Sequence, residues 1–184
     1  MKPPFAEIDF APPLVQRRDR GGGSFELSSP VPLQPYARSL AHLLRLQAET
    51  FPRKDFLAER DASGAWRRVT FSQASRRADS IAQALLERGC APDRPVMILS
   101  GNSIDHALIM LGAFVAGVPV VPVSVAYSLM SQDFEKLKYI YAAVRPGLVY
   151  AASGKVFAKA LGALDLSDTR LVLGAEPPAV SAAE

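Results

Sequence analysis

The most continuous apolar pattern in this chain runs from Pro95 to Val123, and it predicts a strand, a helix and a second strand. Residues 95–100 are short and almost wholly apolar, which is typical of a strand buried on both faces. Asn102 or Ser103 can cap the helix that follows, and Gly117 can end it. Because both joints are short, the two strands should be parallel neighbours linked by a right-handed crossover.

A membrane-spanning helix is the competing interpretation of residues 107–123, which carry no charge. Gly117, Pro119 and Pro122 interrupt this stretch, so a buried helix followed by a buried strand explains it better. Proline cannot donate to a strand ladder. The second strand should therefore begin at Pro119 or lie at a sheet edge.

The same alternation of elements continues towards the C-terminus. Ser131 can open a helix that carries Asp133 and Glu135 in its first turn, and strands are predicted at residues 148–151 and 170–173. A further helix is predicted from Ser153 to Leu164. The order βαβαβαβ predicts an α/β fold, with an open, mostly parallel sheet and helices on both faces.

Amphipathic elements precede this sheet. Ser39 starts a helix, and residues 56–60 and 66–70 are strand-like segments joined by a glycine-containing turn, which predicts a hairpin. Thr70 and Gln73 have the spacing of a capping box. That box opens a long amphipathic helix, which ends at Gly89.

The chain divides into three parts by composition. Residues 1–36 are rich in proline and contain Gly21-Gly22-Gly23, which we interpret as a flexible joint in an irregular N-terminal arm. Residues 37–174 form the α/β subdomain. Residues 175–184 have the composition of a tail, and the chain is expected to stop within a larger protein.

Composition narrows the possible classes of function. The net charge of +3 is small and scattered, which argues against a nucleic-acid surface. The single cysteine, Cys90, allows no intramolecular disulfide, and the N-terminus lacks the apolar core of a signal peptide, so we expect a cytoplasmic protein. Two histidines and one cysteine cannot assemble a zinc-type ligand set.

An open parallel sheet binds ligands beyond the C-terminal ends of its strands. Those ends are residues 100–103, 124–128 and 151–155. Residues 147–156 do not fit a phosphate loop. Six residues separate Gly147 from Gly154 where that motif has four, and Val156 stands where it needs Ser or Thr. We therefore interpret Lys155 as a surface residue. We interpret His106 as a hydrogen-bonded core histidine. Spacing alone therefore indicates no catalytic set.

Several motifs resemble those of a known family. They are a helix ending in F-P-x-K, the hairpin sequence G-x-W-R-x-V-T-F, a helix ending in L-L-E-R-G, and R-P-V-M-I-L-S-G-N-S in the first buried strand. Residues 37–173 are similar to the N-terminal part of the adenylate-forming acyl-CoA synthetases. The segment S-V-A-Y-S-L-M-S-Q-D-F-E-K-L-K most resembles feruloyl-CoA synthetases, although many of these carry proline where this chain has Val125.

The resemblance implies an ATP-dependent ligase. Such enzymes join a carboxylic acid, here an aromatic or other acid, to AMP with release of pyrophosphate, and then transfer the acyl group to coenzyme A (CoA). ATP, Mg²⁺ and CoA would serve the full-length enzyme, with none bound tightly by this chain. The resemblance also places the loop of Ser124, Val125, Ala126 and Tyr127 near the CoA nucleotide. An ordinary strand-to-helix turn, with Tyr127 as a packing residue, explains the same sequence equally well.

The family's phosphate loop, aromatic-Thr-Glu motif, ribose-binding aspartate and late lysine all belong after residue 184. We therefore expect no adenylating activity from this chain alone, which would be a truncated chain or the product of a split gene whose partners are the missing downstream subdomains. The alternative is a non-catalytic binding or scaffold module that pairs with a partner subunit through a sheet edge. A homodimer is compatible with either hypothesis, and neither involves nucleic acid or a membrane span.

Overall fold

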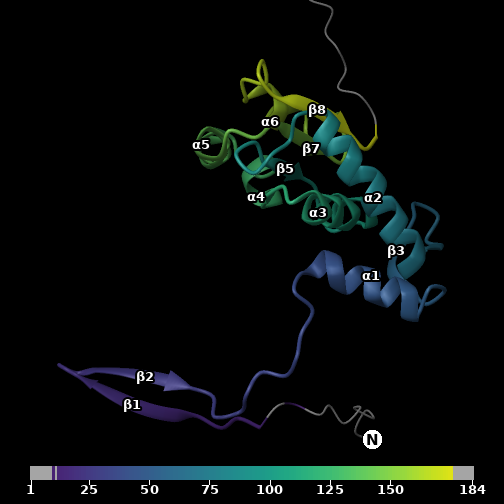
Figure 1. The fold of residues 1–184 in the computed structure, drawn as a ribbon. Helices are drawn as coiled ribbons and strands as arrows, with labels where there is room; N and C mark the ends of the chain where they lie inside the picture. The colour runs from purple at the N-terminus through teal and green to yellow at the C-terminus, as the bar shows by residue number, and fades with distance from the viewer. Residues whose placement is uncertain (1–9, 11, 176–184) are drawn as a thin grey trace, which may run out of the picture. The chain divides into compact units, whose positions relative to one another are not determined.

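A computed structural model of the chain describes residues 10 and 12–175 (Figure 1). Its contacts divide the chain into two units, Met1–Tyr36 and Ala37–Glu184, and each is described by itself. Residues 176–184, nearly all of the predicted tail, lie outside the described residues.

The first unit contains a β-hairpin where the sequence predicted an irregular arm. Strands β1 (Gln16–Gly21) and β2 (Ser24–Ser28) pair antiparallel. The glycine run is the turn between them rather than a flexible joint: φ is 84° at Gly21, 60° at Gly22 and 81° at Gly23. Glycine adopts this left-handed region without steric cost, which permits the tight reversal.

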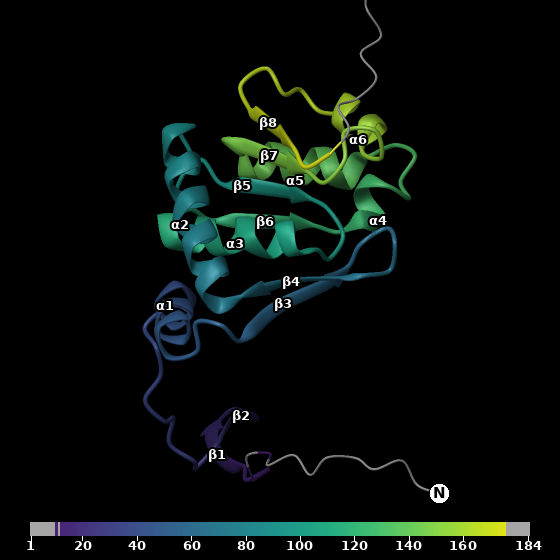
Figure 2. The same cartoon turned by 90° about the vertical axis from the view of Figure 1, so that its right-hand side faces the viewer.

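Four parallel strands form the sheet of the second unit (Figure 2). In spatial order these strands are β6 (Val120–Val123), β5 (Val96–Leu99), β7 (Leu148–Ala151) and β8 (Arg170–Leu173). All three strand pairs are parallel and in continuous register. The predicted open parallel sheet is therefore confirmed.

The prolines of the second predicted strand are accommodated at a sheet edge, as expected. Strand β6 is an outer strand, where Pro122 lies opposite Ile98 of β5. The carbonyl oxygen of Pro119 accepts a hydrogen bond of 2.9 Å from the backbone N–H of Val96. Because no strand pairs with the outer side of an edge strand, the missing N–H of a proline there interrupts no hydrogen-bond ladder.

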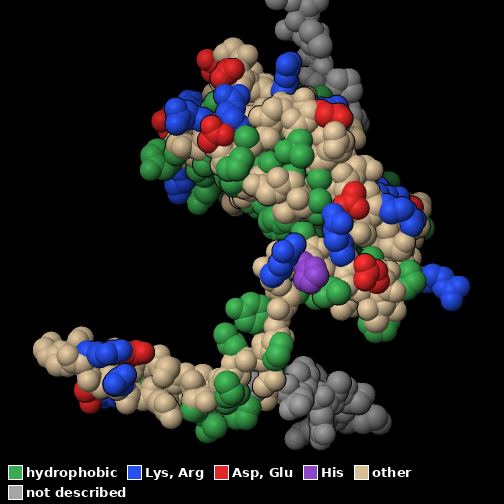
Figure 3. All heavy atoms as spheres, viewed as in Figure 1, with side chains coloured by type: hydrophobic (Ala, Val, Ile, Leu, Met, Phe, Trp, Pro, Cys, Tyr) green, Lys and Arg blue, Asp and Glu red, His purple; other side chains and the backbone are tan. Residues whose placement is uncertain are grey.

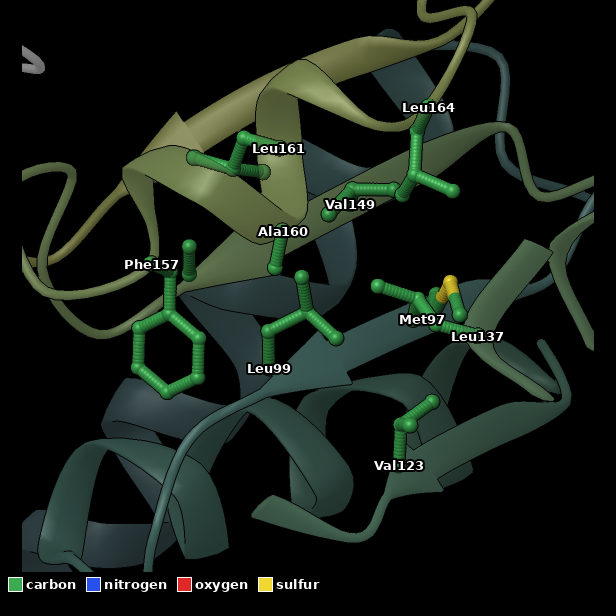
Figure 4. Close-up of a cluster of buried hydrophobic side chains, with 10 residues drawn as sticks. Met97, Leu99, Val123, Leu137, Val149, Phe157, Ala160, Leu161 and Leu164 are labelled. Carbon is green, nitrogen blue, oxygen red and sulfur yellow. The ribbon is translucent and has the colours of Figure 1, made fainter. Parts of the chain in front are cut away.

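Helices cover both faces of the sheet because successive residues of each strand point in opposite directions. Val96 and Ile98 of β5 pack with helices α2 (Phe71–Glu87) and α3 (Ile104–Ala116). Met97 and Leu99 face the other way, where helices α5 (Glu135–Val144) and α6 (Ala158–Gly162) close a second cluster (Figure 4).

A third apolar cluster joins α3 to the elements that precede the sheet. Helix α1 (Leu40–Thr50) begins after Ser39, and strands β3 (Asp55–Arg60) and β4 (Trp66–Thr70) form the predicted hairpin. The cluster consists of Leu44, Val69, Ala74, Ala78, Ile104 and Leu108, with partly buried neighbours. The capping box of Thr70 and Gln73 is also confirmed, with both reciprocal hydrogen bonds present.

Helix α3 lies between two apolar layers, which explains why apolar residues surround it. Ala113 and Ile109 contribute to the cluster on the sheet, whereas Ile104 and Leu108 contribute to the cluster on α1 and the hairpin. Within the described residues no helix combines the length and the hydropathy that a bilayer crossing requires. The structure thus assigns residues 107–123 to a buried helix followed by a strand.

Two predicted helices begin later than expected. Helix α5 starts at Glu135 rather than Ser131, and helix α6 covers only Ala158–Gly162 rather than Ser153–Leu164. At the start of α5, the hydrogen bonds of Ser131 and Asp133 hold Phe134 in a left-handed conformation that a helix cannot include. Before α6, Ser153 makes the contacts of a cap, since its hydroxyl accepts from the Val156 N–H and its carbonyl oxygen from the Phe157 N–H, both at 3.1 Å, but residues 154–157 form turns and regular helix begins only at Ala158.

Gly112 should be essential to the contact between α2 and α3. A Cβ atom at this position would lie 2.4 Å from Cγ2 of Ile81 and 2.7 Å from its Cβ. We expect Gly112→Ala to lower the free energy of unfolding by about 1–3 kcal/mol through overpacking, as measured by urea denaturation. Gly162→Ala, the same change in α6 with no atom within 4 Å, should leave stability unchanged or slightly higher. Equal effects of the two substitutions would contradict this account of the contact.

Candidate functional site

The loop predicted to lie near CoA is a single helical turn at the C-terminal end of β6. Ser124 caps the short helix α4 (Val125–Ser128), and its hydroxyl accepts a hydrogen bond of 3.3 Å from the Ala126 N–H. The Tyr127 N–H donates to the carbonyl oxygen of Ser124 at 2.9 Å. These residues therefore form a strand-to-helix turn at the edge of the sheet where ligands bind in this fold class.

Tyr127 is anchored by its ring. The ring packs against the cluster that α5 and α6 form on the sheet, and Nζ of Lys136 lies 5.1 Å from the ring centroid. An ammonium at this distance is attracted to the aromatic face. The tyrosine consequently links the turn after β6 to helix α5, which corresponds to the packing role allowed for it by the sequence.

A groove of about 500 Å³ lies directly beyond this turn. Leu129 and Met130 form one side of it, while Val156 and Lys159 come from the segment after β7. Met130 is 78% exposed and Val156 57% exposed, so this edge presents apolar surface together with one lysine. None of Ser124, Val125, Ala126 and Tyr127 lines the groove itself.

A hydrogen-bonded loop shapes one side of the groove. The Ser131 hydroxyl donates to Oδ1 of Asp133 at 2.9 Å and accepts from the Phe134 N–H at 3.1 Å. Oδ1 of Asp133 also accepts from the Glu135 N–H at 3.2 Å. These bonds hold Phe134 at a φ of 56°, a left-handed conformation that prevents α5 from starting at Ser131.

The end of β5 carries a partly buried polar pair. Oγ of Ser100, which is 5% exposed, lies 2.6 Å from Nδ1 of His106 on α3. The hydrogen bond expected of His106 is therefore present, but the histidine is only partly buried and is not a core residue. Ser103, rather than Asn102, caps α3, because its hydroxyl accepts from the His106 N–H at 3.0 Å. At the end of β7, Lys155 is exposed, as expected for a surface residue.

A charged network at the start of α3 was not predicted from the sequence. Oε2 of Glu59 accepts a hydrogen bond of 2.7 Å from the Ile104 N–H, and Arg67 contacts both Glu59 and Asp105 at 2.9 Å. Of these three residues, only Asp105 could be linked to the start of α3 from the sequence, because a carboxylate in the first turn is stabilised by the positive end of the helix. The other two partners lie on the distant hairpin strands, so local spacing could not have identified them.

The described residues do not provide a metal site. Among residues 10 and 12–175, no group of three or more His, Cys, Asp or Glu side chains could hold a metal ion. They therefore do not fit the Mg²⁺ that the resemblance implies for a full-length ligase, and we derive no step through a metal. What this part of the chain offers is a positioned turn, a groove lined by both polar and apolar side chains, and a rigid sheet.

Fold and geometry together define an α/β subdomain with a turn and a groove at the C-terminal ends of its parallel strands. The chain belongs to the AMP-binding enzyme family, whose family model matches residues 44–183.

Two curated relatives show local similarity. The chain is 32% identical over 97 residues to tyrocidine synthase 1 of Brevibacillus parabrevis, covering 52% of this chain and 8% of that protein. It is 30% identical over 122 residues to a putative fatty-acid–CoA ligase, fadD25, of Mycobacterium tuberculosis, covering 64% of this chain and 20% of that protein. The chain thus spans no more than a fifth of either relative.

Solved structures share the fold. A fatty acyl-adenylate ligase from L. pneumophila, solved with acyl adenylate and pyrophosphate, matches with a TM-score of 0.60 at 21% identity, covering 74% of this chain and 23% of that one. VinN matches with a TM-score of 0.60 at 20% identity, covering 77% of this chain and 32% of that one. These similarities place the parallel sheet and its helices in a known architecture.

The carboxylate of Asp133 should make the start of α5 sensitive to acid. Hydrogen bonds from the Glu135 N–H and then from the Ser131 hydroxyl lower the pKa of Asp133. Because the folded pKa lies below the usual value of about 3.9, its contribution is complete above that pH and is lost as the pH falls through the folded pKa. The amide resonance of Glu135 should titrate in this range in an NMR pH series. Asp133→Asn should abolish that titration, and its persistence in the variant would contradict the assignment.

Proposed function

We propose that this chain is the N-terminal part of an ATP-dependent acid–CoA ligase. The family match over residues 44–183 is the observation that carries the proposal. In such a reaction the carboxylate first attacks ATP to form an acyl adenylate and pyrophosphate, and the CoA thiol then displaces AMP. Adenylation is needed because a free carboxylate is a poor electrophile, whereas the mixed anhydride has a good leaving group.

In this proposal the chain contributes structure rather than reacting groups. The sheet and its helices hold the turn of Ser124, Val125, Ala126 and Tyr127 in a fixed position, where it forms part of the wall around CoA. The neighbouring groove, with Met130 and Lys159 on its sides, lies at the same edge. The phosphate-binding and catalytic groups would come from the segments that follow in a full-length ligase.

We further propose an aromatic acid as substrate, of the feruloyl or related aryl class. The support is the sequence from Ser124 to Lys138, which resembles feruloyl-CoA synthetases. The relative fadD25 bears the name of a fatty-acid–CoA ligase, so fatty acids are the comparison class for this part of the proposal. A cytoplasmic location is also part of the proposal. It is supported by the single cysteine, Cys90, which is buried and free.

Pyrophosphate exchange tests the ligase assignment. This chain alone should give no acid-dependent exchange of labelled pyrophosphate into ATP. When the downstream part of the ligase is supplied in trans or in frame, exchange should appear and should be faster with ferulate or cinnamate than with a long-chain fatty acid. Exchange by the chain alone would refute the proposal that the phosphate-binding and catalytic groups come from the segments that follow. Preference for the fatty acid would refute only the aromatic substrate.

The turn after β6 can be tested separately in the complete enzyme. Tyr127→Ala should raise the KM for CoA about tenfold, equivalent to ~1.4 kcal/mol, while the KM for ATP stays unchanged. Tyr127→Phe should retain most of the affinity, because the ring supplies the packing. Tyr139→Ala serves as the control, since Tyr139 is a 76% exposed tyrosine on α5. Equal changes in both KM values would indicate a general structural defect instead of a CoA-proximal role.

A non-catalytic module that pairs with a partner subunit is the second candidate. It is favoured by the position of β6 at the sheet edge, where one side of the strand pairs with no other described strand. Exposed edges can accept a strand from another chain. Reading the DNA beyond codon 184 separates the two candidates: an in-frame phosphate loop supports the ligase, and an immediate stop codon supports the module.

A further inference from the structure

A second groove lies at the opposite edge of the sheet, where the strands begin. Its volume is about 340 Å³, and we call it the arginine groove because Arg88, Arg94 and Arg170 line it. Arg94 comes just before β5 and Arg170 is the first residue of β8. The groove is thus separated by the length of the strands from the turn at Ser124–Tyr127, and it plays no part in the function proposed above.

The charge of the arginine groove is unbalanced. Three arginines line it against one carboxylate, that of Asp168, which gives a net charge of +2. A hollow of about 480 Å³ next to it is lined by Arg94 and Arg145 against Asp93, Asp165 and Asp168, a net charge of −1. In Figure 3 basic and acidic side chains lie close together around α5 and β8. Of these two neighbouring hollows, only the arginine groove has an excess of positive charge.

Arg94 is held in place before any ligand arrives. Its Nη1 donates to Oδ2 of Asp168 at 3.0 Å and its Nη2 to the carbonyl oxygen of Asp168 at 2.6 Å. The side chain also lies against Gly147, where a Cβ atom would be 3.0 Å from Cβ of Arg94 and 3.5 Å from its Nε. A guanidinium fixed in this way loses little conformational entropy when it binds an anion.

The other two arginines keep donors available. Nη1 of Arg88 donates to the carbonyl oxygen of Ala84 at 2.9 Å, at the C-terminal end of α2. The Arg170 guanidinium makes no hydrogen bond or ion pair with the part of the chain that the structure describes. Three like charges around one groove repel each other, and a bound anion would relieve that repulsion.

We propose that the arginine groove binds a phosphate-type oxyanion. Guanidinium groups match phosphate oxygens in geometry and charge, and several converging arginines favour a multivalent anion over chloride. Gly89 also lines the groove, and because a Cβ atom there would meet no atom within 4 Å, it leaves room for a ligand to approach the backbone beside the arginines. The ligand is inorganic phosphate or pyrophosphate, or the phosphate group of a nucleotide.

Calorimetric titration of the 184-residue chain at constant ionic strength tests the proposal, with phosphate, pyrophosphate and AMP as separate ligands. We expect millimolar or tighter binding of at least one of them, weakened about tenfold by Arg170→Gln. Arg77→Gln is the matched control, because it removes the same charge from the exposed face of α2 outside the groove. Equal thermal stability of the three proteins without ligand would show that folding is intact.

The ligands distinguish the two sources of phosphate. Stronger binding of phosphate or pyrophosphate identifies a free anion, and stronger binding of AMP identifies a nucleotide. Either result supports the groove if Arg170→Gln weakens the binding and Arg77→Gln does not. Equal weakening by both substitutions, an equal effect of chloride, or no binding at 10 mM ligand (roughly the limit of a weak site) would overturn the proposal.

Discussion

The burial of helix α3 between two apolar layers is the constraint on which the second unit depends. On one side the helix packs against the sheet through Ala113, and on the other it packs against α1 and the hairpin through Leu108. The close approach of Gly112 to Ile81 brings α2 into the same layer. One helix therefore joins the cluster on this face of the sheet to the cluster on α1 and the hairpin, while the strands themselves connect it to the third cluster on the opposite face.

The parallel register of the sheet then separates two kinds of surface. All four strands end at one edge, where the turn after β6 and the groove lined by Met130 and Lys159 lie. All four begin at the other edge, where Arg94 and Arg170 converge on a polar groove. Because parallel strands run in the same direction, the residues that precede them meet at one edge of the sheet, and the residues that follow them meet at the other. Residues far apart in the chain are brought together at both edges. The proposed CoA-proximal turn and the proposed oxyanion site therefore lie at opposite edges of one sheet.

The sequence predicted helix starts and ends reliably where a few neighbouring residues decide them. The capping box at Thr70 and the end of α3 at Gly117 were predicted, and the cap of α3 was narrowed to Asn102 or Ser103, since each depends on neighbours within a few residues. The start of α5 was not, because the hydrogen bonds of Asp133 stabilise a left-handed residue at Phe134. The N-terminal hairpin was missed because the segments on either side of its glycine turn lack the alternation of apolar and polar residues that indicates strands.

From residue 37 onwards the sequence by itself determined the order of the main helices and strands, the parallel sheet and the membership of a broad family, because hydrophobic period and turn residues act over short distances. Only the tertiary structure decided which side chains meet. The contact of Glu59 with the start of α3 and the convergence of Arg88, Arg94 and Arg170 join residues from different elements. Such contacts depend on how the strands are ordered and how the helices cross, and no local pattern in the chain encodes that arrangement directly.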